Sequence, residues 1–381
     1  MVTANRKIYL VFSCTFLCGC CFFIFTAYPP YLTSIGFTLD MVGTVMGAFF
    51  FGTLAGVVGG VSWLIARFGA NLIALLGTTA LLLTTLSLEM SNQFHTLTLL
   101  RFVQGVSWSF VLLSTTVLVV ELSPKERLGQ SLGIYGAIFL LCQAAGPWIG
   151  EALSSRSGSF SSAIFFAAGM ASFGALALTP LLTLKSQKTE GTWPLRDANL
   201  GELWRYAGST FLFASGFGIV FAFIAEYTAT QDFQTYSPFF YSFVLVSLII
   251  RTFFGRIFDD YPRARIAALG ALAQSISMFG LALLQTGSLW QLWLIGAVFG
   301  IAGALFTPAV QATTVSKAES VANGTAIFNG SFLFGVAFFS YLGGFFADLV
   351  SLSFVFVAVS FFSLVAALAV LAPQTIHSEV K

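Results

Sequence analysis

Apolar runs of about twenty residues follow one another along almost the whole chain, separated by short polar turns. About twenty apolar residues in an α-helix are enough to cross the hydrocarbon core of a bilayer. Backbone polar groups have no water to bond there, so a spanning segment of this kind is a helix. We expect twelve spanning helices, at 8–27, 42–65, 71–88, 96–120, 131–150, 160–184, 206–228, 237–257, 265–286, 290–315, 324–347 and 352–372. The sequence therefore predicts an all-α membrane protein.

Composition supports a lipid environment for this chain. It is 57% hydrophobic and 8% charged, whereas soluble domains carry about 25% charged residues. A net charge of +2 without a basic cluster indicates no nucleic-acid partner. The five cysteines (Cys14, Cys18, Cys20, Cys21 and Cys142) lie in apolar segments far from both histidines. We interpret them as small packing residues and expect neither a metal nor a cofactor.

The positions of Lys and Arg predict the orientation of the chain. With both termini on one side, fourteen of the seventeen basic residues fall on that side: Arg6, Lys7, Arg67, Lys125, Arg127, Lys185, Lys188, Arg196, Arg205, Arg256, Arg263, Arg265, Lys317 and Lys381. Cytoplasmic loops carry an excess of Lys and Arg. We therefore expect cytoplasmic termini, in a bacterial inner membrane.

One long polar segment, 185–203, lies near the middle of the chain. It predicts an N-terminal six-helix bundle at 1–184, a cytoplasmic linker at 185–203, and a C-terminal six-helix bundle with a short tail at 204–381. At an offset of about 194, Gly136 corresponds to Gly330 and Gly150 to Gly344. A six-plus-six repeat places a substrate cavity between the halves near the bilayer midplane. Chance matching of independent glycine packing motifs remains the alternative.

An arginine stands inside the fourth predicted helix. Arg101, Gln104 and Gly105 lie on one helical face. A membrane-buried Arg costs about 2.5–3.5 kcal/mol on insertion scales and usually faces a water-filled cavity or a partner. Because Arg keeps its proton, it can hold an anionic group or stabilise a nearby carboxylate as an ion. The alternative is a structural Arg that reaches toward the outer surface.

Three motifs give the chain a family resemblance. The fourth helix has Arg101, Gln104, Gly105 and Ser107 in the pattern R-x-x-Q-G-x-S. The fifth has Gly133, eight residues, Cys142, three residues, Gly146-Pro147, two residues, and Gly150, with Glu151 where a glycine is usual. The loop after the eighth has Gly255, Asp259, Arg263 and Arg265. Over nearly its whole length the chain resembles the major facilitator superfamily, and these motifs resemble its proton-coupled efflux members. The resemblance implies twelve helices in two bundles and transport by alternating access.

The resemblance also implies a gate on the cytoplasmic side. Arg251, Gly255 and Asp259 are four residues apart on one helical face, and we expect Asp259 to accept from the first amides of the fifth helix. In the first half the matching loop is degraded at 62–71, where Ala66 replaces the acid and Arg67 and Gly69 remain. The alternative interpretation is a charge cluster that only sets topology.

Acids within the predicted spans are scarce. Glu226, near the outer end of the seventh helix, is the best candidate for a coupling carboxylate. In the family the fourth and seventh helices both line the cavity, so we expect Arg101 and Glu226 to approach each other. A merely solvated Glu226 remains the alternative. Other candidate pathway residues are the amides Gln143, Gln311 and Asn329 and the aromatic residues Tyr28 and Tyr31.

These features favour a secondary transporter that exports a small amphipathic compound or metabolite in exchange for protons. We expect its partners to be this substrate, protons and the lipid bilayer, and we expect it to act as a monomer. Uptake or exchange of a small organic anion held by Arg101 is the alternative within this class. A membrane enzyme or assembly protein is the alternative from another class. It is disfavoured because the spans hold no Ser-His-Asp set, metal cluster or nucleotide-binding loop.

Overall fold

The computed structural model describes residues 2–157, 159–183, 203–253, 261–284 and 288–372. Eleven helices of this part of the chain are long and apolar enough to cross a membrane, and a shorter apolar helix, α10, completes the set. The first half comprises α1 (Val2–Phe23), α3 (Leu39–Val58), α5 (Ala70–Ser87), α6 (Phe94–Leu122), α7 (Leu128–Ser157) and α8 (Ser161–Leu178). The second comprises α9 (Trp204–Thr230), α10 (Ser237–Phe253), α12 (Arg263–Ala282), α13 (Leu289–Lys317), α14 (Val321–Leu349) and α15 (Leu352–Leu371). The predicted helical membrane fold is confirmed.

Short helices connect some of these spans. They are η1 (Ile24–Ala27), α2 (Pro29–Ser34), α4 (Val61–Phe68), η2 (Leu88–Met90), η3 (Lys125–Arg127) and η4 (Thr179–Thr183). The prediction of one continuous span at 42–65 was wrong, because α3 ends at Val58 and α4 is a separate helix. Gly60 causes the break: its φ of +100° is a left-handed conformation that a residue with a side chain rarely adopts.

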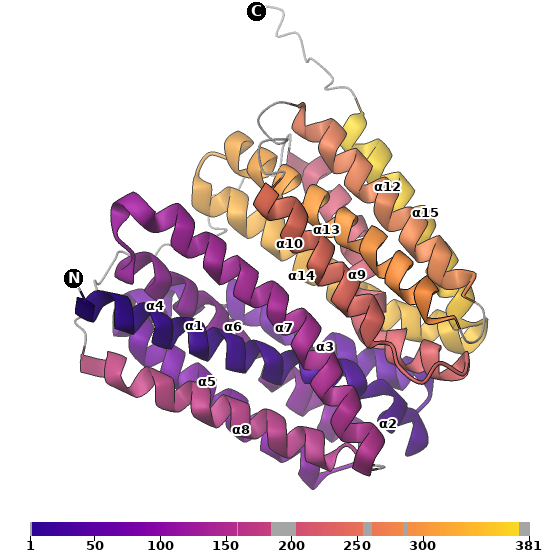
Figure 1. The fold of residues 1–381 in the computed structure, drawn as a ribbon, viewed down its shortest axis with the longest axis horizontal. Coiled ribbons are helices and arrows are strands. Elements are labelled where there is room, and N and C mark those ends of the chain that lie inside the picture. Colours follow the sequence, from indigo (N-terminus) through magenta and orange to yellow (C-terminus); the bar gives the residue numbers. More distant parts are fainter. Residues whose placement is uncertain (1, 158, 184–202, 254–260, 285–287, 373–381) are drawn as a thin grey trace, which may run out of the picture.

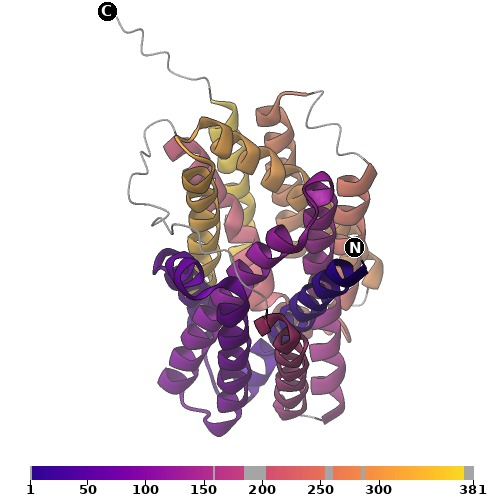
Figure 2. The same cartoon turned by 90° about the vertical axis from the view of Figure 1, so that its left-hand side faces the viewer.

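The helices form two bundles, one from each half (Figures 1 and 2). In the first, α1 packs against α7 and α8, and α6 packs against α3 and α5. In the second, α12 packs against α13 and α15, and α9 packs against α14 and α15. Arg205 ties α9 to the end of α15, where its Nη2 donates to the carbonyls of Ala369 and Val370 at 3.3 and 3.2 Å. These carbonyls belong to the last turn of α15, where no helical N–H group reaches them.

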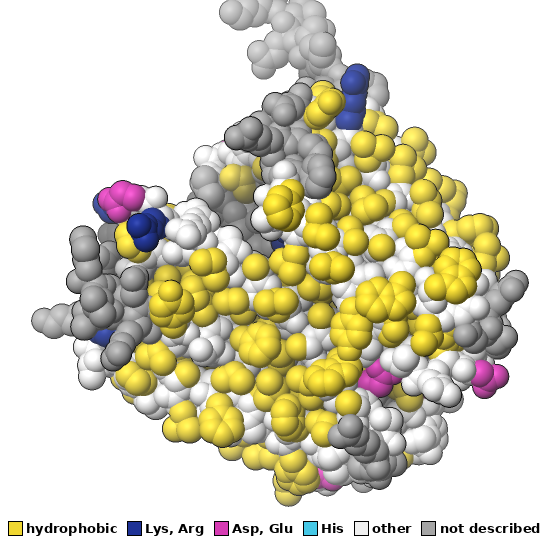
Figure 3. All heavy atoms as spheres, viewed as in Figure 1, with side chains coloured by type: hydrophobic (Ala, Val, Ile, Leu, Met, Phe, Trp, Pro, Cys, Tyr) yellow, Lys and Arg dark blue, Asp and Glu magenta, His cyan; other side chains and the backbone are white. Residues whose placement is uncertain are grey.

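Hydrophobic side chains cover the middle of both bundles in Figure 3. Exposed examples come from most spans, such as Leu83, Phe173, Ile276 and Phe361. Exposed apolar surface of this extent is unfavourable in water and matches the lipid tails around a membrane protein.

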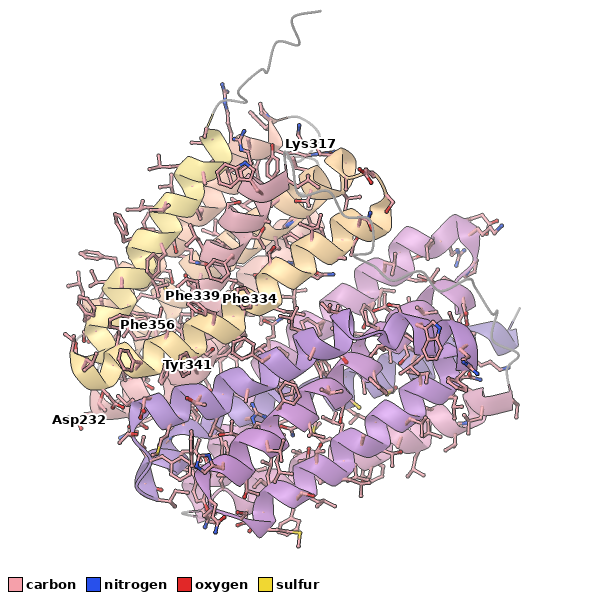
Figure 4. All side chains as sticks on the ribbon, turned by 180° about the vertical axis from the view of Figure 1, so that it is seen from behind. Asp232, Lys317, Phe334, Phe339, Tyr341 and Phe356 are labelled. Atoms are coloured by element: carbon pink, nitrogen blue, oxygen red, sulfur yellow. The ribbon has the colours of Figure 1, made fainter. Side chains whose placement is uncertain are left out.

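The bundles have two ends, which we name by the chain termini. The terminal face is where α1 begins and α15 ends, and it carries the basic residues Arg67, Lys125, Arg127, Arg263, Arg265 and Lys317. The distal face is opposite and carries the acidic residues Asp40, Glu89, Glu151, Asp232 and Asp348. Figure 4 labels Lys317 and Asp232 at the two ends of the second bundle. Acidic residues such as Glu126 also lie at the terminal face, so it is the gathering of basic residues that follows the positive-inside pattern, with the terminal face as the predicted cytoplasmic one.

Candidate functional site between the two bundles

Glycines let the two bundles touch along α3 and α14. A Cβ added to Gly43 would lie 2.4 Å from the Ser340 carbonyl oxygen, and one added to Gly344 would lie 2.3 Å from the Leu39 carbonyl oxygen. At Gly47 the same distance to the Ala337 carbonyl oxygen is 2.8 Å. Small residues of this kind permit close helix packing in membranes. The α3–α14 contact therefore begins at the distal face and depends on missing side chains.

Two carboxylates join the bundles at the distal face. Glu151, near the end of α7, accepts from the Thr235 hydroxyl at 2.9 Å, from the Tyr236 amide at 3.0 Å, and from the Ser237 hydroxyl at the start of α10. Asp348, at the end of α14, accepts from the backbone amides of Leu39 and Asp40 at 3.0 and 2.8 Å. Neither residue was predicted to have a role. Their acidic character near the ends of two spans was the available signal.

A cavity of about 350 Å³ lies between the bundles beside Glu151. Its walls come from the α1–α3 connection, the end of α7, the end of α9 and the start of α10, and they include Tyr31, Ser34, Ser154, Thr228, Gln234 and Thr235. Ser34, Ser155 and Gln234 are exposed, so the cavity is open to solution at the distal face. Water from that side therefore reaches the Glu151 region.

Toward the terminal face the bundles separate. A Cβ added to Gly129, Gly133 or Gly136 of α7, or to Gly330 of α14, would meet no heavy atom within 4 Å. Figure 1 shows the two groups of helices diverging toward the side where α1 begins. The structure is thus closed at the distal face and open toward the terminal face.

Arg101 lies inside the first bundle, where none of its surface is exposed. Its guanidinium is 4.7 Å from the Phe25 ring centroid and 4.8 Å from that of Phe49. Its Nη1 donates to Gln104 Oε1 at 2.5 Å, and Gln104 Nε2 donates to Thr85 Oγ1 at 2.8 Å. Of the expected surroundings, Arg101 has a partner, Gln104, and not a water-filled cavity in this conformation, and its side chain does not reach the surface.

The burial of Arg101 has a clear structural cause. The η1 turn places Phe25 over the guanidinium, and Tyr28, directly after η1, is also buried. Arg101 Nε and Nη2 have no hydrogen-bond partner. A desolvated cation–π contact is worth about 2 kcal/mol or more, which offsets part of the cost of the buried charge. The site therefore holds a cation whose donors are only partly satisfied in this conformation.

Glu226 lies on the opposite bundle and contacts a different partner. It is half-buried on α9 and accepts from the Thr33 hydroxyl at 3.0 Å, across the bundle interface. Its hydrogen-bond partner in the described part of the chain is thus a neutral hydroxyl and not a cation. Among the described residues Arg101 contacts Phe25, Phe49 and Gln104 instead, so the expected approach of Arg101 and Glu226 does not occur here.

Pairs of aromatic side chains join the halves. Phe23 of α1 and Phe221 of α9 have ring centroids 5.3 Å apart, and Phe51 of α3 and Phe334 of α14 have centroids 6.2 Å apart. Figure 4 labels Phe334 on α14. The Phe23 ring also lies 5.7 Å from that of Phe139 on α7. Phe23 and Phe221 are buried and Phe139 is half-buried, so these rings form an aromatic junction between the bundles.

The remaining predicted pathway residues divide into buried and partly exposed ones. Gln143 is buried and donates to the Phe139 carbonyl of its own helix at 3.5 Å, which does not present it to a pathway. Gln311 and Asn329 are half-buried. Tyr31 lines the distal cavity, whereas Tyr28 is buried beside Phe25.

The predicted gating residues lie toward the terminal face. Arg67 is exposed on α4 and stacks over Trp63 at 5.3 Å, and Gly69 has a φ of +94°. Arg251 donates to Thr307 Oγ1 at 3.4 Å. Arg263 and Arg265 are exposed at the start of α12. Gly255, Asp259 and most of the linker at 185–203 lie outside the described residues.

The fifth-helix motif packs mainly within its own bundle. A Cβ added to Gly146 would lie 2.4 Å from Phe23 Cβ, and one added to Gly150 would lie 2.4 Å from the Ile24 carbonyl oxygen. The Pro147 carbonyl accepts the Tyr236 hydroxyl of the other bundle at 3.1 Å. Burial raises the pKa of Tyr236 well above its usual value, and the nearby Glu151 adds to this effect. Tyr236 therefore remains a protonated donor.

Two six-helix bundles joined at one face and separated at the other define a transporter that alternates access to its centre. The family model described as Major Facilitator Superfamily matches residues 11–287 and again 206–380. The chain belongs to the major facilitator superfamily. It is therefore a secondary transporter and not an enzyme.

Solved structures with this fold include several transporters. The human organic anion transporter MFSD10 (TETRAN) has a TM-score of 0.68 at 17% identity, covering 96% of this chain and 99% of that one. The nucleoside transporter NupG has a TM-score of 0.77 at 13% identity, covering 96% and 98%. A POT family transporter in complex with 5-aminolevulinic acid has a TM-score of 0.79 at 13% identity, covering 96% and 95%. At these identities the likeness shows the fold alone.

One curated relative has a higher local identity. The Uncharacterized transporter YebQ of Escherichia coli (strain K12) is 33% identical over 94 residues. This match spans 25% of the present chain and 21% of the relative.

Proposed function

We propose that the protein exports a small amphipathic compound across a bacterial inner membrane in exchange for protons. The supporting observation is the aromatic junction of Phe23, Phe139 and Phe221 between bundles that separate toward the predicted cytoplasm. A compound with apolar and planar parts gains burial and ring stacking there. Its entry from the terminal face and release at the distal face would constitute export.

Proton coupling in this proposal is assigned to Glu226. Its half-buried carboxylate contacts the other bundle through Thr33, so gaining a proton changes an interaction across the interface. A coupling group has to interact differently with the two conformations, because a ligand shifts an equilibrium only through differential affinity. The Glu226–Thr33 contact meets this requirement, since it joins the halves only when the distal face is closed.

The second candidate is uptake or exchange of a small organic anion. It is favoured by the unpartnered Nε and Nη2 of Arg101 and by the exposed Arg251 on the second bundle. The fold neighbour MFSD10 is described as an organic anion transporter. Arg101 would bind an anion only after Phe25 and Phe49 move apart, because both rings cover it here.

Transport by purified protein in liposomes distinguishes these functions. Vesicles with an imposed pH gradient are supplied with a fluorescent amphipathic aromatic cation or with a radiolabelled aromatic carboxylate. The first proposal predicts that the cation accumulates on the side with the higher proton concentration and that accumulation stops when an ionophore removes the gradient. Accumulation of the carboxylate alone would favour the second candidate, and a lack of any response to the gradient would contradict proton coupling.

A further inference from the structure

Glu151 and Asp348 occupy matching positions in the two halves. Each lies near the distal end of a long helix, α7 or α14, and accepts from the start of a helix in the other bundle, α10 or α3. Glu151 and Asp348 are 197 positions apart, and the first residues of α3 and α10, Leu39 and Ser237, are 198 positions apart. The two contacts therefore have the same arrangement in each half, although the carboxylates lie three positions away from the offset of 194 that relates Gly150 to Gly344.

We propose that Glu151 and Asp348 are a pair of latches that hold the distal face closed. Both are hydrogen-bond acceptors for neutral donors of the opposite bundle, namely hydroxyls and backbone amides. The first turn of a helix has N–H groups without helical partners and a partial positive charge, so it favours an ionised carboxylate. Two such contacts stabilise the conformation seen here over one in which the distal ends have separated.

The negative charge of each carboxylate strengthens its latch. A carboxylate accepts at both oxygens, and its charge makes these hydrogen bonds stronger than those of a neutral amide. Glu151 accepts at both Oε1 and Oε2, so a neutral glutamine in its place offers one acceptor oxygen for the three contacts.

The groups around the latches contain no described cation. Near Glu151 the titratable groups are the phenols of Tyr236 and Tyr241 from the α10 side, with Tyr31 across the cavity. Beside Asp348 lies the Asp40 carboxylate, which accepts from the Met41 amide and the Thr38 hydroxyl.

The latch proposal does not depend on the substrate, the direction of transport or Glu226. Its test uses distances between spin labels in the substrate-free protein. Labels at Met90 and Val350, both strongly exposed, report the separation of the bundles at the distal face. Labels at Glu126 and Ser316, also exposed, report the terminal face. The five native cysteines, all buried, are replaced by alanine in this background.

Each latch variant is expected to open the distal face. Glu151→Gln and Asp348→Asn should each raise the ratio of distally open to distally closed molecules about tenfold, and the double variant more, since the two carboxylates bond different donors. Glu89→Gln is the matched control, because Glu89 accepts from Ser161 of its own bundle.

A second pair of variants tests the donors. Thr235→Val and Ser237→Ala remove hydroxyls that bond Glu151 while leaving the carboxylate in place. They should shift the distal distance in the same direction as Glu151→Gln. Unchanged distances in the carboxylate variants, or a shift of equal size in Glu89→Gln, would overturn the proposal.

Discussion

Replacing Gly344 by alanine should drive the protein out of the conformation seen here. The added Cβ would lie 2.3 Å from the Leu39 carbonyl oxygen and 3.1 Å from both Asp40 Cα and Gly43 Cα. These are backbone atoms of another helix, so they cannot move aside as the end of a flexible side chain does. The strain is removed only if α3 and α14 separate at the distal face.

The size of the shift in the conformational equilibrium follows from two opposing contributions to the free energy. Overpacking of a well-packed contact costs about 1–3 kcal/mol. Alanine is about 0.8–1.0 kcal/mol more favourable than glycine inside a helix, but this gain applies to both conformations and cancels between them. The net shift is therefore about 1–3 kcal/mol against the distally closed conformation, or roughly 5- to 150-fold in the population ratio.

Spin-label distances between positions 90 and 350 measure this shift directly. Gly330→Ala is the matched control, since it changes the same residue type on the same helix where no heavy atom lies within 4 Å of the new Cβ. The control should keep the wild-type distal distance. If Gly344→Ala also kept it, close α3–α14 packing would not be what holds the distal face closed.

Four further predictions concern three charged residues. Arg101→Met should abolish transport. The midpoint of its thermal unfolding should stay at or above the wild-type value, because replacing a poorly compensated buried charge by an apolar side chain is often stabilising. Full transport by this variant would mean that Arg101 has no role in the mechanism. Arg101→Lys should restore transport only in part, since lysine lacks the planar group that stacks between Phe25 and Phe49. Glu226→Gln should bind substrate normally yet lose accumulation driven by a pH gradient in liposomes, and retained accumulation would place the proton site elsewhere. Asp259→Asn should favour the terminally open conformation, as measured by the distance between spin labels at positions 126 and 316. If this distance is unchanged, the charged residues around Asp259 only set the topology of the chain.

Local sequence pattern was sufficient for the fold and for the gathering of basic residues at one face. A run of apolar residues predicts a spanning helix because the lipid environment acts on each segment separately. The motif around Arg101 and the Gly146-Pro147 pair indicated the family, which the family model then confirmed. The break at Gly60 was missed because the hydropathy of the segment continues through it, and only the backbone conformation shows where α3 stops.

The environment of each polar side chain was decided only by the tertiary structure. Arg101 was placed on the correct helix from the sequence, but its burial depends on Phe25 and Phe49, which lie 76 and 52 positions away. The Glu226–Thr33 contact joins residues 193 positions apart, and the Asp348 contacts span more than 300. Helical periodicity fixes which face of a helix a residue occupies, whereas its partners depend on how two bundles meet. The interface between the bundles also differs between the conformations of an alternating-access protein. One sequence therefore specifies more than one set of contacts for these residues.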